Sequence, residues 1–76
     1  MADTKTVVTL RTKDGVKIGQ YTMRISMSAA RTAAVFADIT AQGKGLILAT
    51  REAGIILIPK EAASNMLYFV AEEPES

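Results

Sequence analysis

The chain contains no cysteine, no histidine and no tryptophan among its 76 residues. The lack of cysteine excludes a disulfide scaffold, and the added lack of histidine excludes a metal site of the Cys/His type. Both absences also exclude a cysteine nucleophile and any catalytic machinery built on a Ser–His or Cys–His pair. We therefore expect no bound metal and no cofactor.

Long apolar runs are also absent, since none approaches the about 20 residues that a membrane-spanning helix needs. No apolar segment follows the polar start at residues 1–5, so no signal peptide is predicted. With 49% hydrophobic residues, the chain is nevertheless too apolar to be disordered. These features predict a soluble, cytoplasmic globular domain with no membrane contact.

Charge is nearly balanced over the whole chain but unevenly distributed along it. Nine Lys and Arg stand against eight Asp and Glu, and three of these acids (Glu72, Glu73 and Glu75) lie in the last five residues. The preceding 71 residues therefore hold nine basic and five acidic groups, a net charge of +4. This distribution predicts a single domain over residues 6–70, between a flexible N-terminus at 1–5 and a flexible acidic tail at 71–76.

The first part of the chain is typical of a β-hairpin. Residues 6–12 are rich in β-branched side chains, which favour a strand, and the Asp14-Gly15 pair predicts a two-residue type I′ turn. The second strand would then run over residues 16–25. Alternation about this turn sorts the side chains onto a wet face and a core face, the latter with Val8, Leu10, Tyr21, Met23 and Ile25.

The rest of the chain predicts one helix and three further strands. Residues 29–42 are Ala-rich and lack Gly and Pro, so they favour a helix that ends at Gly43, with Thr32, Val35, Phe36 and Ile39 on its buried stripe. Strands are expected over residues 46–51, 55–58 and 66–70, with a three-residue hairpin loop ending at Gly54 and a helical turn at 60–64. The order β-β-α-β-β-β predicts an α+β fold, an antiparallel sheet of four to five strands with one central helix.

The later strands are apolar at both alternating positions, which is typical of strands buried on two faces. A single helix covers only one face, so either the sheet curls into a half-barrel or a second copy covers the other face. A domain this small also needs stabilisation beyond its own core. We therefore expect a non-enzymatic intracellular interaction module that acts as a homodimer or higher oligomer. Its expected interface residues are Ile56, Ile58, Leu67, Tyr68 and Phe69.

The alternative function is a nucleic-acid-binding regulator. Basic side chains project from the wet face of the predicted first hairpin, namely Lys5, Arg11, Lys13 and Arg24. A β-ribbon fits the major groove of DNA, and these side chains would neutralise phosphates. Aromatic side chains that could stack on bases are scarce, and we expect neither Phe36 nor Phe69 on this face.

A candidate anion site lies at the start of the predicted helix. Ser26 and Ser28 can both act as N-caps, and Arg31 follows in the first turns, where a cation opposes the helix dipole. A bound phosphate or sulfate would relieve that opposition.

The acids outside the tail are expected on the surface and unpaired, and no serine has a histidine to activate it. We therefore expect no enzymatic activity.

Overall fold

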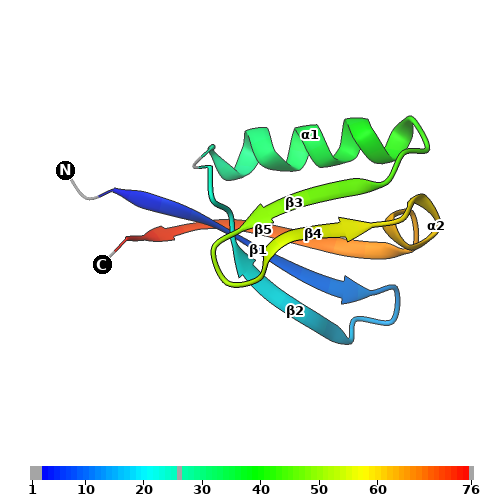
Figure 1. Cartoon of the computed structure of the whole chain (residues 1–76), viewed down its shortest axis with the longest axis horizontal. Coiled ribbons are helices and arrows are strands. Elements are labelled where there is room, and N and C mark those ends of the chain that lie inside the picture. The colour runs from blue at the N-terminus through cyan, green and yellow to red at the C-terminus, as the bar shows by residue number, and fades with distance from the viewer. Residues whose placement is uncertain (1–2, 26, 76) are drawn as a thin grey trace.

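In the computed structural model, which describes residues 3–25 and 27–75, one main helix lies between the second and third of five strands. The α+β class and the strand order are therefore confirmed. The elements, labelled in Figure 1, are β1 (Thr4–Thr12), β2 (Lys17–Thr22), α1 (Ala29–Ala41), β3 (Leu46–Thr50), β4 (Gly54–Ile58), α2 (Lys60–Ala63) and β5 (Met66–Pro74).

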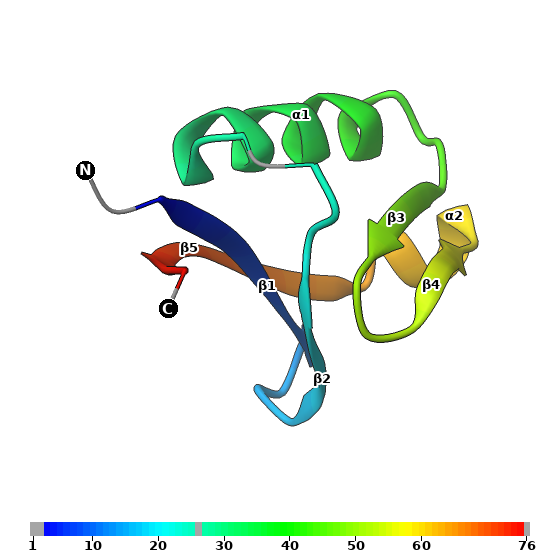
Figure 2. The same ribbon diagram turned by 60° about the vertical axis from the view of Figure 1, so that its left-hand side comes forward.

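Strand β1 lies at the centre of a three-stranded antiparallel sheet, with β2 on one side and β5 on the other. Strands β3 and β4 form a separate antiparallel hairpin. Figure 2 shows α1 lying over the three-stranded sheet, with the β3–β4 hairpin beside the space between them. The apolar sides of these elements meet in a core formed by Val8, Leu10, Phe36, Leu46, Leu48, Ile58 and Ala63.

Helix α1 begins and ends as the sequence predicts. Ser28 is the N-cap, and its hydroxyl accepts a hydrogen bond from the backbone N–H of Arg31 at 3.1 Å. Gly43 follows the C-cap with φ 71°, a left-handed conformation that favours glycine. Thr32 and Phe36 are buried, whereas Val35, expected on the same stripe, is 37% exposed. The buried stripe of α1 is narrow because the helix packs mainly on β5 and makes fewer contacts with β3.

The register that a two-residue turn at Asp14-Gly15 implies is confirmed over most of the first hairpin, from Val7 opposite Thr22 to Leu10 opposite Gly19. A bulge after Leu10 then places Arg11 opposite Lys17. The prediction of a type I′ turn is wrong, because such a turn needs positive φ at both central residues and in this loop only Gly15 has it, at 88°. One glycine in the left-handed region closes this longer loop, so Asp14 avoids a conformation that costs energy for any residue with a Cβ.

The pairing of β1 with β5 extends into both segments that the sequence assigns to the ends of the chain. Strands β1 and β5 pair over nine residues each, from Thr12 opposite Met66 to Thr4 opposite Pro74. Residues 4–5 and 71–74, expected in flexible ends, therefore belong to this ladder. The guanidinium of Arg51 fixes the end of the strand by binding both carboxylate oxygens of Glu75, at 2.5 and 2.8 Å. This ion pair lowers the pKa of Glu75.

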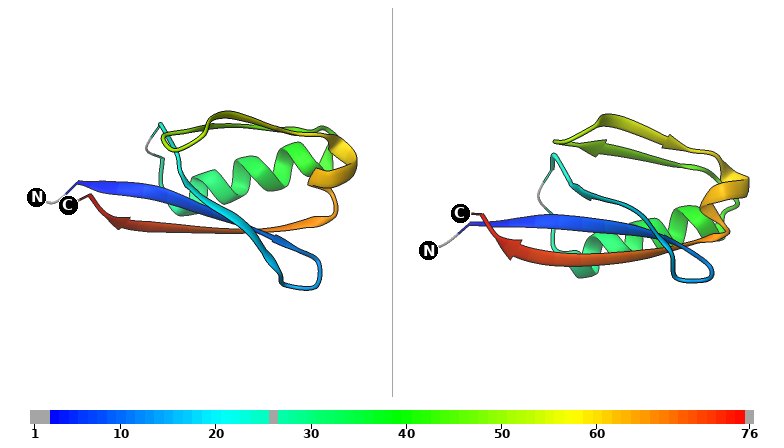
Figure 3. Two further views of the ribbon diagram at one scale, coloured as in Figure 1. Left: turned by 60° about the horizontal axis from the view of Figure 1, so that its bottom comes forward. Right: turned by 90° about the horizontal axis from the view of Figure 1, so that it is seen from below.

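The two sheets are joined where β2 ends. Met23 forms an antiparallel bridge with Thr50. The backbone N–H of Arg24 donates to the carbonyl of Ala49, and that of Arg51 donates to the carbonyl of Thr22, each at 2.9 Å. The five strands therefore follow one another in space as β5-β1-β2-β3-β4, and they curl around the core (Figure 3).

The carboxylate of Glu52 reinforces this joint. It accepts hydrogen bonds from the hydroxyl and from the backbone N–H of Thr22, each at 2.7 Å. These bonds hold the pKa of Glu52 below its ordinary value, and the bond from the hydroxyl has the larger effect. A carboxyl whose pKa is depressed in the folded state stabilises that state when it is ionised, and this contribution is lost as the pH falls through the folded-state pKa.

The first prediction concerns the core. Leu48 is fully buried at 0% exposure, whereas Leu67 is 41% exposed. We expect Leu48→Ala to lower the free energy of unfolding by roughly 2–5 kcal/mol, because it removes transfer energy and leaves a cavity. Leu67→Ala should cost less than about 1 kcal/mol. Urea unfolding followed by circular dichroism measures both, and equal losses would contradict the assignment of Leu48 to the core.

The second prediction concerns acid sensitivity. The stabilisation from Glu52 is fully present above the unfolded-state carboxyl pKa of about 4.3 and is lost progressively below it. Glu52→Gln should therefore be less stable than the wild type at neutral pH and should lose less stability on acidification. The measurement is urea unfolding at a series of pH values.

Glu61→Gln serves as the control, because the carboxylate of Glu61 binds none of the described residues. Its stability should follow the wild-type pH dependence. A pH dependence of Glu52→Gln that runs parallel to the wild type would show that Glu52 does not couple folding to protonation.

Candidate functional site

The five residues expected at a self-association interface do not share one surface. Ile58 is 7% exposed, and Ile56 and Tyr68 are half-buried against the core, so these three pack within their own chain. Leu67 and Phe69 are exposed, but they lie on β5, whereas Ile56 and Ile58 lie on the β3–β4 hairpin. The side chains of Ile56, Ile58 and Tyr68 therefore fill the space under α1 and inside the curl, on the side away from the exposed surface of the sheet.

The outer face of the β3–β4 hairpin carries an apolar surface, formed by residues that the sequence analysis did not assign to an interface. Ile47 and Leu57 are each 70% exposed, and Ile55 is 67% exposed. Ile47 lies opposite Leu57, and Ala49 lies opposite Ile55, so the four side chains are adjacent on one face. We call these four residues the hairpin face. The sequence predicts a second apolar face on these strands but not which side chains lie on it, because residues at both alternating positions of β4 are large and apolar.

The four candidate basic residues lie at two separate ends of the first hairpin. Lys5 is near the start of β1, opposite Glu73, and Arg24 follows the end of β2. Arg11 and Lys13 lie at the other end, beside the β1–β2 turn. The structure therefore divides the four residues into two pairs at opposite ends of the hairpin, and acidic residues of β5 lie beside the pair that contains Lys5.

The turn end of the three-stranded sheet combines basic and aromatic side chains. Arg11 lies opposite Lys17 on β2 and opposite Leu67 on β5. Its guanidinium carbon lies 5.6 Å from the centre of the Phe69 ring, within the range of a cation–π contact. The expectation that no phenylalanine shares the basic face is therefore wrong for Phe69. We call Arg11, Lys17, Leu67 and Phe69 the turn-end face.

The candidate anion site at the start of α1 is occupied by the chain itself. The backbone N–H of Ala29 donates to the carboxylate of Glu72 at 3.2 Å, so a negative charge of β5 lies where an external anion was expected. Ser28 caps the helix, and Arg31 is exposed. Ser26 lies outside the described residues. The paired extension of β5, which the sequence did not indicate, brings Glu72 to this position.

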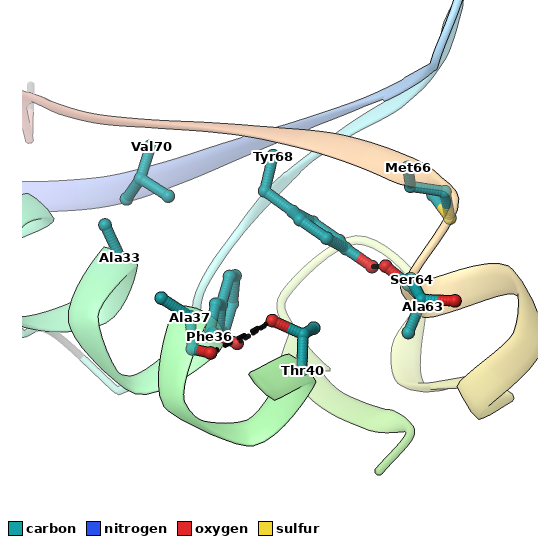
Figure 4. Close-up of a pocket in the computed structure, with 9 residues that line it drawn as sticks. All are labelled: Ala33, Phe36, Ala37, Thr40, Ala63, Ser64, Met66, Tyr68 and Val70. Atoms are coloured by element: carbon teal, nitrogen blue, oxygen red, sulfur yellow. Dashed lines mark hydrogen bonds between the residues drawn. The ribbon is translucent and has the colours of Figure 1, made fainter. Parts of the chain in front are cut away.

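An apolar cleft of about 300 Å³ lies between α1, α2 and β5 (Figure 4). The rings of Phe36 and Tyr68 meet edge to face in its wall, with centroids 5.7 Å apart. The Tyr68 hydroxyl donates to the carbonyl of Ala63 at 2.9 Å, and the Thr40 hydroxyl donates to the carbonyl of Phe36 at 2.9 Å. Partial burial raises the pKa of Tyr68. With both hydroxyls engaged within the chain, the cleft suits an apolar group better than an ionised one.

Residues 3–25 and 27–75 lack two further features. Within these ranges, no group of three or more acidic side chains is placed to hold a metal ion. In the same part of the chain, no helix has the length and apolar character needed to cross a membrane.

No protein-family model matches this chain, and neither the curated proteins nor the solved structures contain a significant match. The surfaces described above must therefore be interpreted from their own geometry and chemistry.

Proposed function

We propose that this protein is a non-enzymatic interaction module that acts as a homodimer, in which the hairpin faces of two copies pack against each other. The observation that carries this proposal is the exposure of Ile47, Ile55 and Leu57, each at 67–70%, on one face. The face contains no charged side chain. Contiguous exposed apolar surface of this kind is typical of interaction sites.

The shape and chemistry of the hairpin face favour a second copy as its occupant. A partner of different composition would have to supply an equally uncharged surface, which the chain itself already offers. A twofold axis through the face would place the same residues on both sides, as in an isologous dimer. Ile47 and Leu57, which lie opposite each other, would then meet their counterparts near the axis.

The energetics are consistent with a dimer of moderate affinity. Full burial of an exposed Ile or Leu side chain contributes about 1.5–3 kcal/mol. Two copies would bury six such side chains, each about two-thirds exposed in the single chain. Scaled by that exposed fraction, the gain is roughly 6–12 kcal/mol. It exceeds the cost of association at the lower end of its range of about 4–15 kcal/mol, so these contacts alone can sustain a dimer.

Strand β4 adds a second reason for self-association. It pairs with β3 on one side and is an edge strand on the other. Its five residues, Gly54–Ile58, include no charge and no proline that would discourage pairing with another chain. An edge of this kind leaves backbone N–H and C=O groups free to pair with another chain, which adds to the tendency to self-associate.

The third prediction tests the dimer by sedimentation equilibrium at micromolar concentrations. The wild type should approach twice the 8.1 kDa of one chain as its concentration rises. Ile55→Lys should sediment as a single chain, because it places two like charges at an apolar contact. Its far-UV circular dichroism should stay unchanged, because Ile55 is 67% exposed.

Ile18→Lys is the matched control, because Ile18 is 54% exposed on a strand of the other sheet. This variant should dimerise like the wild type. Two results would overturn the proposal: a wild type that sediments as a single chain throughout, or an Ile55→Lys variant that self-associates as strongly as Ile18→Lys.

A further inference from the structure

We infer that the turn-end face binds single-stranded nucleic acid, with the Phe69 ring as a stacking platform for a base and the basic side chains around it as phosphate contacts. This surface is separate from the hairpin face, and the inference does not rest on dimer formation.

The pairing of β1 with β5 builds the platform. Thr9 lies opposite Phe69 and Arg11 opposite Leu67, and directly opposite residues share one face of a sheet. Phe69 is 53% exposed and Leu67 is 41% exposed, whereas Leu10, on the other face of β1, is 3% exposed. The ring of Phe69 is therefore held by a three-stranded sheet and remains accessible.

The contact between Arg11 and Phe69 makes this exposed aromatic suitable for a base. The guanidinium lies 5.6 Å from the ring centre, and one of its N–H groups also donates to the carbonyl of Gly15 at 2.9 Å. Arg11 is thus held on both sides, beside an exposed ring. Bases stack on aromatic rings and on guanidinium planes, and such stacking tolerates any base.

The distribution of charge favours an anionic strand at this end of the sheet. Lys13 and Lys17 are exposed beside Arg11, and Asp14 is the single acid in residues 4–25. The acids of β5 lie at the opposite end, where Glu73 faces Lys5. Figure 1 shows the β1–β2 turn and the two termini at opposite ends of the molecule. A strand that stacks on Phe69 would therefore meet three cations and little repulsion.

The combination points to a single strand rather than to a duplex or an acidic peptide. The bases of a duplex are stacked on each other and cannot reach an exposed ring without unpairing. An acidic peptide would use the three cations but would gain nothing specific from the flat aromatic surface. The single strand uses both the ring and the cations.

The fourth prediction concerns the affinity for a single strand. Fluorescence polarisation measures the Kd for a short labelled single-stranded DNA of mixed sequence and for the RNA of the same sequence. Contact with three phosphates predicts a slope of about 2 when log Kd is plotted against log salt concentration between about 50 and 200 mM. Replacing both Lys13 and Lys17 by Gln should lower that slope to below about 1, because one phosphate contact is left.

Two substitutions separate stacking from charge. Phe69→Leu keeps an apolar side chain but removes the ring, and it should weaken binding roughly tenfold. Arg11→Gln should weaken binding by a similar factor. Arg24→Gln is the matched control, because Arg24 belongs to the other end of the hairpin, and it should change the Kd less than about twofold. Circular dichroism checks that each variant is folded.

Three results would overturn the inference. The first is the absence of binding by the folded wild type at low salt. The second is unchanged affinity of Phe69→Leu, and the third is equal weakening by Arg24→Gln and Arg11→Gln. Polyglutamate and a duplex of the same sequence serve as competitors. If polyglutamate displaces the strand from wild type and Phe69→Leu equally well, the face is an acidic-peptide site.

Discussion

The strands of the C-terminal half are apolar on two faces, and one helix covers only one of these faces. The rest of the structure follows from this constraint. The joint between β2 and β3 at Met23 and Thr50 lets the five strands curl, so that the inner sides of β1, β3 and β4 meet Phe36 of α1. The curl leaves the outer side of the β3–β4 hairpin exposed, with Ile47, Ile55 and Leu57 on it.

The acidic end of the chain has structural roles in addition to its charge. Because β5 pairs with the whole of β1, it brings Glu72 to the start of α1 and Glu75 to Arg51 in the β3–β4 loop. The first contact supplies the negative charge that a helix N-terminus favours. The second ties the hairpin to the three-stranded sheet, beside the bonds that Glu52 accepts from Thr22. The acids are thereby kept away from the basic turn end of the sheet.

The local features of the fold could be predicted from the sequence, because they depend on short-range physics. Ser28 and Gly43 mark the ends of α1, Gly54 closes the second hairpin with φ 68°, and β-branched residues mark β1. The sequence predicts the turn at Asp14 and Gly15 but not its type. Composition favours a turn there, while the bulge after Leu10 depends on how two whole strands pair.

The surfaces depend on information that local patterns do not carry. In β4, a register shift by one residue would exchange the two inward side chains, Ile56 and Ile58, with the two outward ones, Ile55 and Leu57. Because all four side chains are large and apolar, the alternation pattern does not show which pair faces the core. The contact of Arg11 with Phe69 joins residues 58 positions apart through the register of β1 and β5. The sequence therefore predicts one basic face with Lys5 and Arg24, whereas in the structure these two lie at the opposite end of the hairpin from Arg11, and Lys17 lies beside Arg11 instead.

We propose that a second copy of the chain covers the hairpin face. Isotope-filtered NMR on a mixture of labelled and unlabelled protein tests it most directly, because the experiment records contacts between copies alone. A dimer through the hairpin face predicts intermolecular contacts among the methyl groups of Ile47, Ile55 and Leu57. Their absence at concentrations where the protein sediments as a dimer, or intermolecular contacts that involve other side chains instead, would contradict it.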